Sequence, residues 1–289
     1  MKLPSSIAID KKGDIIIASS NDHSIYKAGL DQSFEEYIAG IVYNSELINP
    51  SGIDVGTDGK VYVSDKDNNR IFAKEKNKYK NIMDSNSGFK SPSALRALKN
   101  GSIVAVCDDG QSVKRISSNG RIATLLEPGI VSGMTDIAVY QNSDIYIVST
   151  YENKVFKILS RNEVELIAGA DKDKGLKGNI IPAKEAKLFK PVSIDFDNKG
   201  NLYIAEKEKG YLRIINSDGV LNRVAGGGSK INLDGLTSTN NVNLKNVTKI
   251  RIGNGPKIYL SQMVENSIIC ITPTGNYNYI GSDLLMTPM

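Results

Sequence analysis

Apolar and polar residues alternate in short stretches that recur six times along the 289-residue chain. When each stretch is aligned on one anchor position, the third and fifth residues after the anchor are apolar in every copy. The six anchors are Pro4, Pro50, Pro92, Met134, Pro191 and Val247. Because a period of two is typical of a β-strand, each anchor is predicted to begin one.

Three further strands are predicted in each repeat. A turn position follows nine residues after the anchor and is glycine in four copies. The next strand is apolar on both faces, as in 61-VYV-63, and should be buried on both sides. A third strand opens 21 residues after the anchor, and a more polar fourth strand follows a turn, as in 118-SNGRIATLLE-127.

Four strands per repeat, with apolar inner strands and a polar outer strand, indicate an all-β fold: a six-bladed β-propeller of four-stranded antiparallel blades. One domain spanning 1–289 is expected, with blades starting near 4, 50, 92, 134, 191 and 247. Because only three residues precede Pro4, the sixth blade should be completed by its own C-terminal segment.

Two of the repeats resemble those of the NHL-repeat propeller family. They are 50-PSGIDVGTDGKVYVSDKDNNRIF-72 and 191-PVSIDFDNKGNLYIAEKEKGYLRII-215, which follow the family's pattern of proline, apolar strand, Asp, Gly-Asn-Leu-Tyr-Val-Ala-Asp and Asn-Arg-Ile. Repeats three, four and six lack the Asn-Arg-Ile element. The resemblance implies the same six-bladed fold. Some animal members bind RNA, so an RNA-binding NHL domain is one alternative.

The turn 64-SDKDNNRIF-72 places Asp65, Asp67 and Asn69 at alternate positions, as at the start of an EF-hand calcium loop. Arg70 stands where that loop needs glycine, strands flank the turn, and the same ligands do not recur in the other repeats. The sequence therefore predicts no metal ion and no cofactor. The turn is interpreted as a polar hairpin at one edge of a recognition face.

Two long insertions, 168–190 and 225–246, should emerge on the same face as that turn. The first insertion carries six lysines against three acidic residues. The simpler interpretation of this insertion is a solvated loop, and the more specific one is a patch for an anionic partner. The candidate binding residues on this face are Lys172, Lys174, Lys177, Lys184, Lys187, Asp65, Asp67, Asn69, Arg70, Asn153 and Lys230.

No catalytic set is predicted. Related propellers include zinc-dependent lyases with several His ligands, but His23 is the chain's one histidine, on an expected surface turn. A calcium-dependent lactonase-like hydrolase is a second alternative and needs carboxylates at the axis. The acidic residues of strand one, Asp10, Asp54 and Asp195, are interpreted as polar lining of the channel.

Composition adds few constraints. A formal charge of +4 from 36 basic and 32 acidic residues is too mild to indicate nucleic acid by itself. Cys107 and Cys270 fall in repeats three and six, on opposite sides of the ring, so no disulfide is expected. No signal peptide or membrane-spanning run is visible, which favours a cytoplasmic or virion-associated location.

The sequence as a whole favours binding over catalysis. We expect a propeller that presents one loop-rich face to a protein or cell-surface ligand, as a subunit of a larger assembly such as a virion or surface appendage.

Overall fold

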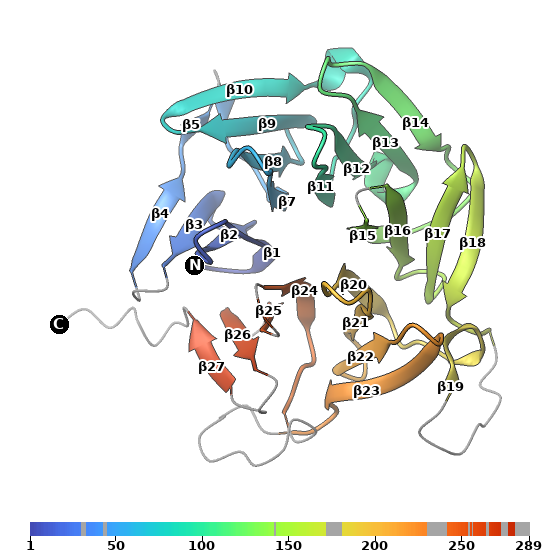
Figure 1. Cartoon of the computed structure of the whole chain (residues 1–289). Coiled ribbons are helices and arrows are strands. Elements are labelled where there is room, and N and C mark those ends of the chain that lie inside the picture. Colours follow the sequence, from blue (N-terminus) through green and yellow to red (C-terminus); the bar gives the residue numbers. More distant parts are fainter. Residues whose placement is uncertain are drawn as a thin grey trace.

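The computed structural model describes residues 1–29, 33–42, 45–141, 143–171, 181–229, 242–253, 255, 257–263, 266–272 and 277–280. Within them, six antiparallel sheets are arranged like blades around a central axis (Figure 1). The predicted all-β, six-bladed propeller is confirmed. No helix among these residues is long and apolar enough to cross a membrane.

The first three blades follow the predicted repeats, although the first strand of blade 3 begins three residues after Pro92. Blade 1 contains β1 (Pro4–Ile9), β2 (Ile15–Ser19), β3 (Ser24–Ala28) and β4 (Phe34–Ile38). Blade 2 contains β7 (Pro50–Val55), β8 (Val61–Asp65), β9 (Arg70–Glu75) and β10 (Lys78–Met83). Blade 3 contains β11 (Leu95–Ala97), β12 (Ile103–Cys107), β13 (Ser112–Ile116) and β14 (Ile122–Leu126).

The last three blades have the same strand order. Blade 4 contains β15 (Met134–Tyr140), β16 (Asp144–Ser149), β17 (Lys154–Ser160) and β18 (Glu163–Ala168). Blade 5 contains β20 (Pro191–Phe196), β21 (Leu202–Glu206), β22 (Tyr211–Ile215) and β23 (Val220–Gly226). Blade 6 contains β24 (Val247–Ile252), β25 (Ile258–Gln262), β26 (Ser267–Ile271) and β27 (Tyr277–Ile280).

Short elements occupy the connections between blades. The pair β5 (Ile41–Val42) and β6 (Ser45–Glu46) lies between blades 1 and 2, and β19 (Ile181–Pro182) lies between blades 4 and 5. Three 3₁₀ turns complete the described elements, namely η1 (Ser85–Ser87), η2 (Asp108–Gly110) and η3 (Ala183–Glu185).

The hydrophobic core lies between neighbouring blades. Strands β2, β8, β12 and β25 are buried along their whole length, as predicted from their apolar faces. One core cluster joins Ala8 and Ile16 of blade 1 to Ile53 and Phe72 of blade 2. Because each blade packs its two faces against two neighbours, the apolar second strand is covered on both sides.

The ring closes between the first and last blades, where β1 packs against β24 (Figure 1). All four strands of blade 6 come from β24 to β27, so the predicted completion of this blade by its own segment is confirmed. The hydroxyl of Thr248 donates a hydrogen bond to the carbonyl of Pro4 at 2.7 Å and ties the two ends together.

The same hydroxyl bond recurs elsewhere around the ring. Ser5 donates to the carbonyl of Pro50 at 2.6 Å, and Ser51 donates to the carbonyl of Pro92 at 3.0 Å. Beside this contact, a side chain at Gly52 would place its Cβ 1.9 Å from the carbonyl oxygen of Ser93. The inner strands therefore approach too closely for any residue other than glycine at that position.

Part of the insertion after blade 4 is built into the fold. Strand β19 pairs with β23 and gives blade 5 a fifth strand, and Ala183, Ala186 and Leu188 are buried. The interpretation of 168–190 as a solvated loop is therefore wrong for residues 181–190, because their apolar side chains fill a gap between blades 4 and 5. Residues 172–180 lie outside the described part of the chain.

The two ends of the propeller differ in what they carry. At one end, which we call the loop face, lie the turns between second and third strands and the segments that lead into the next blade. At the opposite end, which we call the turn face, lie the turns between first and second strands. Both long insertions connect blades on the loop face.

Thr248→Val tests the contribution of ring closure. Valine keeps the shape of threonine but leaves the carbonyl of Pro4 without its donor, so we expect a loss of about 1 kcal/mol in unfolding free energy. Urea denaturation of this variant and of Thr124→Val, which makes the same exchange on the outer strand β14, measures the difference. Equal losses in the two variants would contradict a closing role for Thr248.

Candidate functional site

Charged side chains from four blades meet at the axis. The carboxylate of Asp136 in blade 4 lies 2.8 Å from Lys249 Nζ in blade 6. Arg96 of blade 3 and Arg251 of blade 6 each place a guanidinium nitrogen 3.8 Å from the same carboxylate. Arg96 also lies 3.7 Å from Asp195 of blade 5. We call these five residues the axial cluster.

Four of the five residues of the axial cluster are almost removed from solvent, and the fifth, Asp195, has a side chain that is 18% exposed. Asp136 is fully buried, and the side chains of Arg96, Lys249 and Arg251 are 8%, 4% and 6% exposed. Asp136 also accepts hydrogen bonds from the Ser193 hydroxyl and from the backbone N–H of Ile194 in blade 5. A charge buried to this extent is stable only when it is paired and hydrogen-bonded, so Asp136 is the hub of the cluster.

The pKa values reflect this mutual dependence. Burial alone would raise the pKa of Asp136, but attraction to Lys249, Arg96 and Arg251 outweighs it and lowers the pKa. Burial lowers the pKa of Lys249 to about 8, against the opposing attraction of Asp136. Burial and the positive charge of Arg96 both lower the pKa of Arg251. Three cations therefore share a site in which Asp136 is the best-compensated anion.

A pocket of about 330 Å³ opens beside the cluster, at the turn-face end of the axis. Arg96, Arg251, Asp54 and Asp195 line it together with apolar side chains, among them Ile9. The interpretation of Asp54 and Asp195 as axial lining agrees with this arrangement. Asp10 differs, because its carboxylate pairs with Lys27 at 3.2 Å and accepts from the backbone N–H of its own turn.

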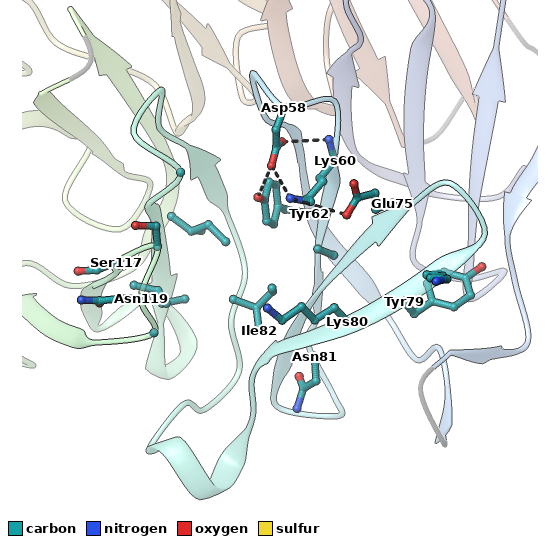
Figure 2. A pocket seen from close by; sticks show the side chains of 17 residues that line it. Asp58, Lys60, Tyr62, Glu75, Tyr79, Lys80, Asn81, Ile82, Ser117 and Asn119 are labelled. Atoms are coloured by element: carbon teal, nitrogen blue, oxygen red, sulfur yellow. Dashed lines mark hydrogen bonds and ion pairs between the residues drawn. The ribbon is translucent and has the colours of Figure 1, made fainter.

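A second, larger pocket of about 680 Å³ lies between blades 2 and 3. Figure 2 shows Asp58, Lys60 and Glu75 on its blade 2 wall and Ser117 and Asn119 across from them. Lys60 Nζ lies 2.9 Å from Asp58 and 3.7 Å from Glu75. Lys60 pairs with both carboxylates, so these three charged side chains largely satisfy one another. The groove therefore offers a shaped surface between two blades rather than a reactive group.

The turn that resembled a calcium loop has a structural role. Asp65 is fully buried, and it accepts hydrogen bonds from Arg70 Nε at 2.6 Å, from Asn68 and from the backbone N–H of Ile48. Arg70 is itself 5% exposed. The prediction that Asp65 and Arg70 present side chains on an exposed binding face is therefore wrong, because they clamp the segment leading into their own blade.

The predicted contact residues Asn69 and Asn153 also hold the blades together. Asn69 accepts a hydrogen bond from the backbone N–H of Ser91, and Asn153 accepts one from that of Lys190. His23 accepts the equivalent bond from the N–H of Asn49 through Nδ1. Each acceptor side chain thus reaches the segment that leads into the next blade, which links neighbouring blades on the loop face.

The remaining predicted residues lie at the surface or outside the described chain. Asp67 is exposed and accepts from the side chain of Asn49. Lys184 is exposed and pairs with Glu165 at 2.8 Å, and Lys187 lies over the ring of Phe189. Lys172, Lys174, Lys177 and Lys230 lie outside the described residues.

Lysines and aromatic rings gather on the loop face where blades 4 and 5 meet. Tyr151 is 80% exposed. The amines of Lys187 and Lys209 both lie over the ring of Phe189, at 5.8 and 5.3 Å from its centroid. Asn153, two residues after Tyr151, binds the backbone next to Phe189. We call Tyr151, Lys187, Phe189, Lys190 and Lys209 the blade 4–5 patch.

The carboxylate of Asp136 is not free to bind a calcium ion. Oxygen ligands of Ca²⁺ must be free to face the ion, whereas Asp136 faces three cations and its oxygens already accept hydrogen bonds. Among the described residues, no three His, Cys, Asp or Glu side chains come together as a metal site would require. Asp136 is therefore committed to the axial cluster.

Comparison with known proteins agrees with this architecture. The sequence profile of the family described as NHL repeat matches residues 47–73, the predicted second repeat. The protein is a six-bladed β-propeller that carries an NHL repeat in its second blade. No curated protein sequence matches the chain significantly.

Solved structures similar to this NHL-repeat propeller serve different purposes. A virginiamycin B lyase from Staphylococcus aureus is 17% identical with a TM-score of 0.63, over 96% of this chain and 84% of that one. A gluconolactonase from Xanthomonas campestris is 10% identical with a TM-score of 0.66, over 90% and 82%. A nidogen/laminin complex is 13% identical with a TM-score of 0.58, over 74% of this chain and 76% of that one. At such identities the likeness shows the fold alone.

The axial cluster was missed from the sequence, although its signal is present. Its members occupy the second and fourth positions after the anchors, where other repeats carry small residues such as Ala8 and Ser6. No single repeat contains a cation and its partner together. Aligning charges rather than apolar residues across repeats three to six would have indicated that they meet.

Asp136→Asn tests the hub of the axial cluster. The change leaves three buried cations without their shared anion, so we expect a loss of about 3 to 5 kcal/mol in unfolding free energy. Asp144→Asn removes a carboxylate from a surface ion pair with Lys157 at 2.7 Å and should cost less than about 1 kcal/mol. Denaturation of both variants at pH 7 gives the comparison, and similar losses would contradict the hub.

A separate pH dependence should arise from Glu206, which occupies the position of Asp65 in blade 5. Burial raises the pKa of Glu206 to about 7, although Arg213 opposes the shift. In the unfolded chain this carboxyl loses its proton near its ordinary pKa of 4.5. Between pH 4.5 and 7, rising pH therefore favours the unfolded state, by about 3 kcal/mol in total, and the penalty is constant above that range.

Glu206→Gln should remove that penalty. Gln262 occupies the equivalent position in blade 6 and donates to the carbonyls of Asn243 and Lys245, so the fold accommodates an amide there. The stability advantage of the variant should grow from pH 4.5 to 7 in chemical denaturation. Glu35→Gln, the same exchange at an exposed position on β4 in blade 1, is the control and should run parallel to the wild type. Parallel profiles for Glu206→Gln as well would refute the assignment.

Proposed function

We propose that this NHL-repeat propeller is a non-catalytic binding module that takes an acidic protein partner on its loop face, at the blade 4–5 patch. The observation that carries the proposal is the 80% exposure of Tyr151 beside two lysines that lie over one phenylalanine ring. Exposed aromatic anchors next to cations are typical of the residues that dominate protein interfaces.

The scaffold beneath the patch is suited to binding without rearrangement. Asn153 and Thr150 both bond to the backbone of the segment leading into blade 5, at 2.8 and 2.6 Å. The backbone of Tyr151 also lies so close to Gly133 that a Cβ there would meet the Cβ of Tyr151 at 2.5 Å. An anchor on a fixed backbone loses little conformational entropy when a partner binds.

The charge of the patch favours an acidic partner. Lys187, Lys190 and Lys209 are exposed, whereas Glu208 is the acidic neighbour that faces solvent beside them. Electrostatic complementarity of this kind speeds association and selects among partners. One of the similar structures is a nidogen/laminin complex, and this supports a protein partner for a propeller of this fold.

Photo-crosslinking tests this proposal. A photoreactive phenylalanine in place of Tyr151 should form an adduct with one defined protein in an extract of the native source. The same group in place of Leu159, which is 52% exposed near the opposite end of β17, is the control and should form none. Lys187→Glu combined with Lys209→Glu should weaken binding of the identified partner about tenfold, because both cations are reversed.

Four results would overturn the proposal. Two concern the crosslink itself: no adduct forms at position 151, or position 159 gives the same adduct in equal yield. An adduct that disappears after ribonuclease treatment would identify RNA as the partner instead of a protein. Partner binding unchanged by the double lysine reversal would place the contact elsewhere on the molecule.

A further inference from the structure

One member of the axial cluster has more donors than the protein uses. Arg251 is 5% exposed, and its Nη1 donates to the carbonyl of Ile250 at 2.7 Å. Its Nε and Nη2 are both buried and have no hydrogen-bond partner in the structure. A buried guanidinium with two unused N–H groups carries a large desolvation cost, so these atoms indicate a missing acceptor.

The two unused nitrogens have a defined geometry. Nε–H and Nη2–H lie on the same edge of a guanidinium and point in parallel, which matches two oxygens of one carboxylate or phosphate. Arg251 lines the axial pocket of about 330 Å³, whose volume lies within the range of small-molecule sites. Arg96 lines the same pocket from blade 3 and adds a second positive charge.

The other pocket residues allow an anion to bind there. Asp54 and Asp195 each use one oxygen to accept from the backbone N–H of the next blade, at Ala97 and Ile252. Burial raises the pKa of Asp195, which favours the neutral form beside a bound anion. Ile9, Val139 and Ile252 give the pocket an apolar wall that suits the carbon skeleton of an organic acid.

We propose that the turn-face end of the axis is a binding site for a small oxyanion, a carboxylate or a phosphate, held by the Nε–Nη2 edge of Arg251 with Arg96 nearby. The site is separate from the blade 4–5 patch, because it lies at the axis and opens at the opposite end of the propeller. Its ligand is a small molecule, and the site is independent of the protein partner proposed above.

Calorimetric titration of the whole chain tests the site at constant ionic strength. The probes are benzoate, which combines a carboxylate with an apolar ring, and inorganic phosphate. Benzamide, the neutral analogue of benzoate, is the ligand control and should bind at least about tenfold more weakly than the better anion. Tighter binding of benzoate assigns the site to organic acids, and tighter binding of phosphate assigns it to phosphate esters. Either result supports the oxyanion site.

Two variants locate the binding. Arg251→Lys keeps the charge but removes the paired N–H edge, and should weaken the better probe about tenfold, which corresponds to about 1.4 kcal/mol. Arg121→Lys makes the same exchange at an exposed position and should leave the affinity unchanged. Val139→Phe fills the pocket without removing a charge, so it decides the question if Arg251→Lys does not fold.

The site is refuted if neither benzoate nor phosphate binds the wild-type protein at tens of millimolar. It is also refuted if the affinity of the better probe is the same in the wild type, in Arg251→Lys and in Val139→Phe. Equal binding of benzamide and benzoate would show an apolar cavity in place of an oxyanion site.

Discussion

The inner strand of every blade has one edge that no other strand can pair with, because the blades diverge around an axis. Side chains of the neighbouring blade provide the missing partners. Asp54, Asp136 and Asp195 accept from backbone N–H groups of the following blade, and the hydroxyls of Ser5, Ser51 and Thr248 donate to carbonyls of the next. Without these bonds, buried backbone groups would be left unsatisfied at the centre of the molecule.

That constraint also explains the charges at the axis. A carboxylate placed there to accept a backbone N–H must itself be compensated once it is buried, and Arg96, Lys249 and Arg251 supply the compensation for Asp136. The cations outnumber the anions that bind them closely, which leaves one edge of Arg251 unused. The need to hydrogen-bond the backbone of the inner strands thus leads to a pocket with more cationic N–H donors than acceptors.

On the loop face, other side chains bond to the backbone between blades, and the face remains available for binding. Asn69, Asn153 and His23 reach the backbone that leads into the next blade, so the polar turns are occupied with holding the ring together. The side chains that remain exposed, above all Tyr151 and the lysines around Phe189, lie on a backbone fixed by those bonds. Side chains held on a fixed backbone in this way are suited to recognition.

The period-two pattern and its six anchors determined the fold from the sequence alone, because each blade is a local unit whose apolar strands must be covered on both faces. The same pattern could not separate polar residues that bond to the backbone of neighbouring segments from polar residues that contact a partner. Asp65 and Asn69 would look the same in the sequence in either role, because both are polar residues in a turn. Only the structure shows that they accept hydrogen bonds from the backbone N–H groups of Ile48 and Ser91. The axial cluster was equally hidden, since its charges come from four blades up to 155 residues apart in the chain. Electrostatic pairing depends on distance in space, and only ring closure brings those charges together.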